Sequence, residues 1–93
     1  MARFTVVITS AFKRDLKRLE KDQHEITSLY EEVVFILEND PYNIERKHDI
    51  KKLGGVKHGD GQFRMRIGKW RIRYDIEKNF VILYSFKDRK FGY

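Results

Sequence analysis

The chain has 93 residues, a length that suits one domain with a single hydrophobic core, and residues 1–93 are interpreted as that one domain. It contains no cysteine, which excludes disulfides and thiolate chemistry and fits a reducing cytoplasm. Its longest apolar runs are too short to cross a bilayer and its first residues do not resemble a secretory signal, so we expect a cytoplasmic protein without membrane contact.

The net charge of +6 is unevenly distributed along the chain. Residues 1–46 carry 7 Lys+Arg against 9 Asp+Glu, whereas residues 47–93 carry 13 against 5. A basic half joined to a mildly acidic half favours a surface that binds anions. A merely well-solvated exterior is the alternative.

One strand and two helices are predicted in the first half. Alternation of apolar residues predicts a strand over residues 3–9. Apolar residues spaced by four and three predict a helix over residues 12–19, with Ser10 as its cap. Apolar residues at helical spacing predict a second helix over residues 26–37. It should end before Pro41, because proline disfavours helix in the residue before it. Two such helices joined by a short turn should form an antiparallel hairpin.

Three strands are predicted in the second half, after an irregular polar segment at residues 42–52 and a glycine-rich loop at residues 54–61. The first two form the hairpin described next, and the third spans residues 80–86 after a turn at residues 77–79. The order β-α-α-β-β-β indicates an α+β fold. We expect an antiparallel-rich sheet of about four strands with the helical hairpin packed on one face.

Arginines alternate with apolar residues on both sides of Gly68-Lys69, a pattern that predicts a β-hairpin with a type II′ turn. The expected cross-strand pairs are Phe63–Tyr74, Met65–Ile72 and Ile67–Trp70 on one face, and Arg64–Arg73 and Arg66–Arg71 on the other. Each like-charge pair costs about a few tenths of a kcal/mol. A fold that tolerates two such pairs is expected to bind an anion there, and phosphate is the first candidate.

Leu53-Gly54-Gly55, the arginine hairpin at residues 63–74, the hydrophobic strand after it and the basic-aromatic tail together resemble the RelE/ParE toxin superfamily. The similarity extends over nearly the whole chain and points to the RelE-like mRNA interferase branch. It implies a RelE-like microbial RNase fold and a bacterial or archaeal type II toxin–antitoxin module. Such a toxin is an endoribonuclease that cleaves mRNA in the ribosomal A site and inhibits translation.

The resemblance also implies a cognate RelB-like antitoxin, and the ribosome with its mRNA, as partners. Members of the ParE branch share the hairpin pattern, so a non-enzymatic toxin that poisons DNA gyrase is the main alternative. A catalytically inactive RNA-binding relative is a third interpretation. The apolar run at residues 33–37 is wider than one helix face, and its surplus, with Phe12 or Tyr30, is where an antitoxin would dock.

Carried over by position, the resemblance assigns six candidate catalytic residues. Two lie on the first hairpin strand, one on the next, two are alternatives after the last strand, and one is a C-terminal tyrosine. They are Arg64, Arg66, Arg71, Lys87, Arg89 and Tyr93.

The chemistry of RNA cleavage can also be considered from the residues themselves. Attack by the RNA 2′-hydroxyl requires a base, an acid and stabilisation of a doubly charged phosphorane. The histidines are scattered and the carboxylates form no metal-like cluster, so neither a histidine pair nor a metal or other cofactor is expected. Arginine stays protonated, so Arg64, Arg66 and Arg71 should hold the phosphate and its developing charge. Lys87 or Tyr93, with a pKa lowered by crowded cations, would serve as acid or base.

Six further residues are predicted to contact RNA: Lys51, Lys52, Lys57, Arg73, Lys90 and Phe91. The alternative for the first three is a solvated loop charge, and the alternative for Arg73 is a structural ion pair or a brace on the sheet. Phe91, if exposed, would stack on a base.

Overall fold

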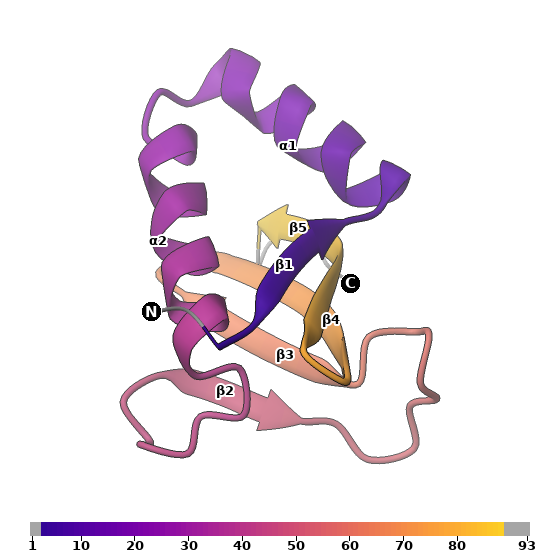
Figure 1. Ribbon diagram of the computed structural model, residues 1–93. Coiled ribbons are helices and arrows are strands. Elements are labelled where there is room, and N and C mark those ends of the chain that lie inside the picture. Colours follow the sequence, from indigo (N-terminus) through magenta and orange to yellow (C-terminus); the bar gives the residue numbers. More distant parts are fainter. Residues whose placement is uncertain (1–2, 89–93) are drawn as a thin grey trace.

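The structure is a computed structural model that describes residues 3–88. These residues form a five-stranded mixed sheet with two helices over one face (Figure 1). The elements are β1 (Thr5–Ile8), α1 (Ser10–Asp22), α2 (Ile26–Asn39), β2 (Asp49–Lys52), β3 (Phe63–Ile67), β4 (Trp70–Glu77) and β5 (Phe80–Asp88). The strand order is β1-β5-β4-β3-β2; β1 runs parallel to β5, and all other neighbours are antiparallel. The predicted α+β class is confirmed, with five strands in place of about four.

The additional strand is β2, which lies at an edge of the sheet where the sequence suggested an irregular segment. Ile50 is half-buried opposite Met65 on the core face, while Lys51 points to the other side. A segment of four residues with one apolar side chain carries too little alternation to predict a strand. Its charged residues suit an exposed edge, because charge there opposes pairing with another chain.

The first helix begins at Ser10, two residues before the predicted start, and its cap is Thr9 in place of Ser10. The Thr9 hydroxyl oxygen accepts a hydrogen bond from the Phe12 amide at 3.2 Å. The same hydroxyl donates to the Leu83 carbonyl oxygen at 2.9 Å, so the cap also ties α1 to β5. This second bond depends on a residue 74 positions away, which local sequence does not reveal.

Both helices contribute to one core on the apolar face of the sheet. They diverge from their connecting loop in a V, so that α1 lies over β5 while α2 runs down past β1 (Figure 1). The buried hydrophobic residues are Phe12, Ile26, Val33, Ile36, Leu37, Phe63, Met65, Trp70, Ile72, Tyr74, Val81, Leu83 and Phe86. Among residues 3–88, none of the helices is long and apolar enough to cross a membrane.

The arginine hairpin adopts the predicted register throughout, from Ile67 opposite Trp70 to Phe63 opposite Tyr74. Gly68 has a φ of +58° and the next residue does not have a positive φ, as a type II′ turn requires. The alternation that predicted this element is therefore also the alternation that places its arginines on one face.

The last strand contains an irregularity that the sequence did not reveal. Arg73 pairs with Ser85 whereas Tyr74 pairs with Leu83, so Tyr84 is an extra residue on the β5 side. As a result Leu83 and Phe86 both face the core, and Tyr84 and Ser85 both lie on the opposite side of the sheet.

Candidate nucleic-acid interface

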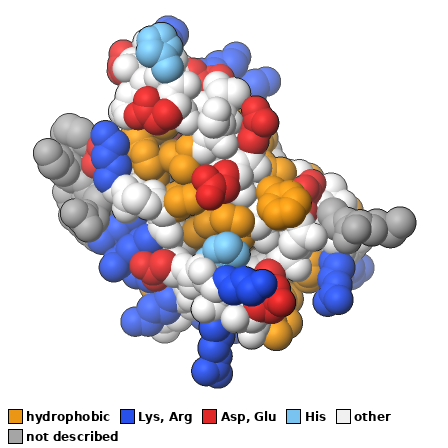
Figure 2. All heavy atoms as spheres, turned by 90° about the vertical axis from the view of Figure 1, so that its left-hand side faces the viewer, with side chains coloured by type: hydrophobic (Ala, Val, Ile, Leu, Met, Phe, Trp, Pro, Cys, Tyr) orange, Lys and Arg blue, Asp and Glu red, His pale blue; other side chains and the backbone are white. Residues whose placement is uncertain are grey.

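The side of the sheet that the helices leave uncovered carries a dense group of basic residues, here called the arginine face. It consists of Lys51, Arg64, Arg66, Arg71, Arg73 and Lys87. Cross-strand partners point to the same side, so the register aligns Arg66, Arg71 and Lys87 in one row and Lys51, Arg64 and Arg73 in the next. In Figure 2, Lys and Arg side chains gather along the lower part of the molecule, below a band of mixed hydrophobic and acidic side chains.

Arg64 is largely enclosed by its neighbours on this face. Its side chain is 13% exposed, and its Nη2 donates to Asp49 Oδ1 at 3.0 Å. The Asp49 side chain is 56% exposed, so solvent weakens this ion pair. The buried Nε of Arg64 makes no hydrogen bond within residues 3–88. That Nε is enclosed, but a guanidinium has five N–H groups and Asp49 engages one nitrogen, so the Nη groups of Arg64 retain donors that a phosphate oxygen would satisfy.

Arg66 and Arg71 differ in exposure although they face each other across the hairpin. Arg66 is exposed, and although Asp49 is its cross-strand neighbour on β2, no carboxylate of residues 3–88 forms an ion pair with it. Arg71 is half-buried between Arg66 on β3 and Lys87 on β5. The row thus runs from the exposed Arg66, next to Asp49 on the edge strand β2, to the half-buried Arg71 and Lys87.

Arg73 braces a loop through backbone carbonyls: its Nε donates to the Gly61 carbonyl at 2.8 Å and its Nη2 to the Asp60 carbonyl at 3.2 Å. Gly61 has a φ of +83°, and a Cβ there would lie 3.1 Å from the Arg73 Cβ. The glycine is therefore needed for both its backbone conformation and the close approach of Arg73.

A buried carboxylate, that of Asp75, binds the backbone amides of the same loop. Asp75 is fully buried and accepts hydrogen bonds from the amides of Gly59 at 2.6 Å, Gln62 at 2.7 Å and Gly61 at 3.3 Å. Burial alone would raise the pKa of Asp75, but these amides and the Tyr84 hydroxyl outweigh it and lower the pKa below the ordinary 3.8. Asp75 stays ionised and holds the segment that braces Arg73.

The Tyr84 hydroxyl belongs to the same network. Its pKa is raised above 10.0 by burial, by the hydrogen bond to Asp75 and by nearby negative charges. Tyr84 is accordingly a stable hydrogen-bond donor and is unsuited to act as a base near neutral pH.

Lys87 lies at the far end of the arginine face, where α1 approaches β5. Its Nζ donates to Asp15 Oδ1 at 3.0 Å, and the same oxygen accepts from Arg18 Nη2 at 3.1 Å. The other Asp15 oxygen accepts from the Phe86 amide at 3.1 Å. A candidate acid or base thus lies within a network organised by a buried carboxylate.

The remaining candidates are placed in different ways. Lys51 is exposed on the arginine face and Lys57 is exposed on the glycine-rich loop, whereas Lys52 points to the opposite side, with its Nζ 5.9 Å from the Phe63 ring centroid. Arg89, Lys90, Phe91 and Tyr93 lie outside the described residues. Within residues 3–88, no group of three His, Asp or Glu side chains could hold a metal ion.

Sequence reasoning did not identify the roles of Asp15 and Asp75. Asp75 continues the alternation of Arg71 and Arg73, which puts it on the arginine face. Asp15 is an acid within a run of basic residues on α1. Each position was a usable signal, but the loop amides lie 13 to 16 residues from Asp75, and Phe86 and Lys87 lie 71 and 72 residues from Asp15.

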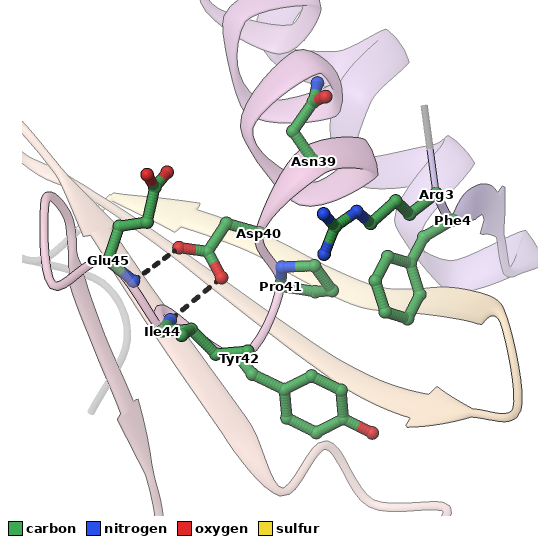
Figure 3. A pocket seen from close by; sticks show the side chains of 8 residues that line it. All are labelled: Arg3, Phe4, Asn39, Asp40, Pro41, Tyr42, Ile44 and Glu45. Atoms are coloured by element: carbon green, nitrogen blue, oxygen red, sulfur yellow. Dashed lines mark hydrogen bonds between the residues drawn. The ribbon is translucent and has the colours of Figure 1, made fainter. Parts of the chain in front are cut away.

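A separate hollow of about 640 Å³ lies where α2 ends (Figure 3). The Asp40 carboxylate there accepts hydrogen bonds from the amides of Ile44 at 2.8 Å and Glu45 at 3.0 Å, so it serves as a local structural cap.

Large apolar side chains are exposed near this hollow. Tyr42 and Ile44, which line it, are 50% and 74% exposed. Phe35, one helical turn before the lining residue Asn39, is 67% exposed. Phe35, Tyr42 and Ile44 are here called the apolar patch; Phe12, an expected docking residue, is instead fully buried.

Residues 6–91 match a family model described as ParE toxin of type II toxin-antitoxin system, parDE. No curated protein matches the chain significantly. Among solved structures, it is similar to a chain of the RelBE2 toxin–antitoxin complex of Mycobacterium tuberculosis, with 26% identity, a TM-score of 0.70 and coverage of 94% of this chain and 99% of that one.

Two archaeal structures are also similar. A chain of the RelE–RelB complex of Pyrococcus horikoshii has 25% identity and a TM-score of 0.68, with coverage of 97% of this chain and 99% of that one. A chain of the RelB–RelE complex of Methanococcus jannaschii has 20% identity and a TM-score of 0.66, with coverage of 90% and 91%, and at that identity supports the fold alone.

Proposed function

The chain belongs to the RelE/ParE family of type II toxin–antitoxin toxins, and we propose that it is a ribosome-dependent endoribonuclease that cleaves mRNA in the A site, in the cytoplasm, and so inhibits translation. The observation that carries this proposal is the double row of cations on one face of the sheet, with Arg64 incompletely hydrogen-bonded. Such a surface suits a phosphodiester, whose oxygens accept the paired donors of guanidinium groups.

In this proposal the arginines hold charge and do not transfer protons. Arg64, Arg66 and Arg71 remain protonated and stabilise the phosphorane formed when the RNA 2′-hydroxyl attacks. Proton transfer is assigned to Lys87 and Tyr93, with Arg89 as the positional alternative to Lys87. The reaction requires only these side chains, so no metal or cofactor takes part in the proposed mechanism.

Other basic residues would position the RNA without contacting the reacting atoms. Lys51, Arg73 and Lys57 suit backbone phosphates near the arginine face, and Lys90 and Phe91 are proposed to extend the contact. Lys52, on the opposite side of the sheet, would have to reach a different segment of the RNA or of the ribosome.

The direct test adds purified toxin to translating ribosomes and maps the new mRNA ends. We expect cleavage by the unmodified chain and a reduction of about 100-fold in rate for Arg66→Ala, because a preorganised charge on the phosphorane is removed. Lys21→Ala, an exposed cation change on α1, is the matched control. Intact mRNA with the unmodified chain, while a reference toxin of the branch cuts, would refute the proposal.

Poisoning of DNA gyrase without catalysis is the second candidate. The observation that favours it is the family description, which names ParE and parDE. It predicts DNA-damage signalling on expression and no new mRNA ends.

A third candidate, RNA binding without catalysis, is favoured by the pairing of Arg64 with Asp49 and of Lys87 with Asp15. It predicts unchanged toxicity for Arg71→Ala.

The proposed partner that restrains the toxin is a RelB-like antitoxin, since similar chains are seen in toxin–antitoxin complexes. We place its docking on the apolar patch, where Tyr42 and Ile44 are exposed at the hollow and Phe35 is exposed one helical turn before its lining residue Asn39. Phe35→Ser with Ile44→Ser should reduce co-purification of the antitoxin at least about tenfold, whereas Phe80→Ser, an exposed residue elsewhere, should not. Equal retention by both variants would place the antitoxin on another surface.

A further inference from the structure

A groove between α1 and β5 borders the arginine face and shares one residue, Lys87, with the proposed reaction. Its volume is about 380 Å³. The polar residues that line it are Arg14, Asp15, Arg18, Tyr84, Ser85 and Lys87. We propose that this groove is a second phosphate site, which binds a backbone phosphate of the same single-stranded RNA next to the scissile one. This inference rests on the proposed function.

The groove has an excess of positive charge that its carboxylate organises without cancelling. Three cations, Arg14, Arg18 and Lys87, surround the single negative charge of Asp15. One Asp15 oxygen accepts from both Lys87 and Arg18, which draws together two groups that would otherwise repel each other. The other oxygen is bound to the Phe86 amide. Because an ammonium has three donors and a guanidinium has five, both cations retain N–H groups for a phosphate.

Arg14 completes the cationic lining. It is exposed, and within residues 3–88 no carboxylate pairs with it. It lies four residues before Arg18, so both side chains project from the same side of α1. Ser85 on the opposite wall adds a hydroxyl donor, while the hydroxyl of Tyr84 is engaged by Asp75. Guanidinium, ammonium and hydroxyl groups around one hollow are the donor set that binds phosphate.

The register connects this groove to the arginine face. Ser85 is the cross-strand partner of Arg73, and Lys87 is the partner of Arg71. Neighbouring strands are about 4.8 Å apart, so the groove lies within about two strand spacings of the two arginines on β4. A strand of RNA held by Arg71 would therefore meet the groove with a neighbouring phosphate.

The test measures binding without cleavage, using a fluorescently labelled 2′-O-methyl RNA that lacks the attacking hydroxyl. We expect the double variant Arg14→Ala with Arg18→Ala to bind about tenfold more weakly. Its slope of log affinity against log salt should fall by about 0.7, because one phosphate of the RNA is no longer neutralised by the protein. Arg14→Lys with Arg18→Lys should keep most of that slope, because the charge is retained.

The matched control is Lys17→Ala with Lys21→Ala, which removes equal charge from the same helix at exposed positions that do not line the groove. An affinity and slope of the arginine double variant equal to those of the unmodified chain would overturn the proposal. So would an equally weakened lysine control, which would indicate a general charge effect. Inorganic phosphate that competes with RNA for the unmodified chain, but not for the arginine double variant, would support the proposed phosphate site.

Phosphate binding that depends on Arg14 and Arg18, together with RNA affinity that does not, would show that the site does not bind a polynucleotide.

Failure of the proposed reaction would give a different result. Intact mRNA in the ribosome assay, together with the expected weakening of RNA binding, would refute the ribonuclease but leave the groove as an RNA phosphate site. Cleavage at the normal rate with unchanged RNA binding by the arginine double variant would refute the groove alone.

Discussion

The two ends of the arginine face are both organised by a buried carboxylate, yet the two carboxylates have different partners. At the loop end, Asp75 accepts from backbone amides of residues 59–62 and fixes the chain that braces Arg73. At the helix end, Asp15 accepts mainly from the charged side chains of Lys87 and Arg18. Amide donors fix a backbone, whereas charged donors position side chains that can still exchange partners. The loop end should therefore be the rigid end and the helix end the adaptable one.

The largest expected effect is that of Asp75→Asn. An amide cannot accept the same set of hydrogen bonds, and buried N–H groups would be left without their acceptor, so we expect a decrease of about 3 kcal/mol in the free energy of unfolding. Urea denaturation measures it, and Asp60→Asn on the exposed part of the same loop is the control. A decrease no larger than that of the control would show that the loop does not depend on Asp75.

Acid should weaken the loop end in a defined direction. Because the folded-state pKa of Asp75 lies below its ordinary 3.8, its stabilising contribution is fully present above that value and is lost as the pH falls through the folded-state pKa. Unfolding free energies measured from about pH 5 to about pH 2 should fall less steeply for Asp75→Asn than for the unmodified chain. Parallel curves would contradict the assigned ionisation.

Asp15→Asn should lower the free energy of unfolding by about 2 kcal/mol, less than Asp75→Asn, because the released cations are hydrated by water. The side chains of Lys87 and Arg18 are 41% and 64% exposed.

The contrast between the two ends is sharpest in hydrogen exchange. Asp15→Asn should leave the amides of Gly59 and Gln62 as protected as before, and Asp75→Asn should expose them. Faster exchange of these amides in both variants would mean that the two ends are not independent.

The smallest expected effect is that of Gly61→Ala, about 1 kcal/mol, from a positive φ and a Cβ pressed against Arg73. Gly54→Ala is the matched control, because nothing lies within 4 Å of a Cβ there. Thermal unfolding of both variants measures the difference. Equal melting temperatures would indicate that the loop yields readily, and that Arg73 is less firmly braced than the distances imply.

Sequence patterns predicted those parts of the molecule that depend on local alternation. The hairpin from Phe63 to Tyr74 follows from period-two alternation around Gly68, and that pattern also determines which arginines share a face. The helices follow from apolar spacing, although the Thr9 cap was missed because its hydroxyl also bonds to β5.

The parts that could not be predicted depend on partners distant in sequence. The edge strand β2 is stabilised by its pairing with β3, and its own four residues give little signal. The side chains of Asp15 and Asp75 are ordinary acids in the sequence and acquire their roles only when Lys87 and the glycine-rich loop fold against them. The residues of the arginine face were predictable because they follow from local alternation. The carboxylates that position them were not, because their partners are distant in sequence.

Because Tyr84 is an extra residue, the alternation of core-facing and outward-facing residues in β5 shifts by one position after it. Val81 and Leu83 reach the core at odd positions, and Phe86 reaches it at an even one. Deleting Tyr84 would leave Leu83, Ser85 and Phe86 in regular alternation, so Phe86 would still face the core. Keeping all residues without the irregularity would instead turn Phe86 toward water and Lys87 toward the core. An alignment of a relative that lacks this irregularity must therefore place its gap at Tyr84, so that Leu83 and Phe86 both keep their core positions.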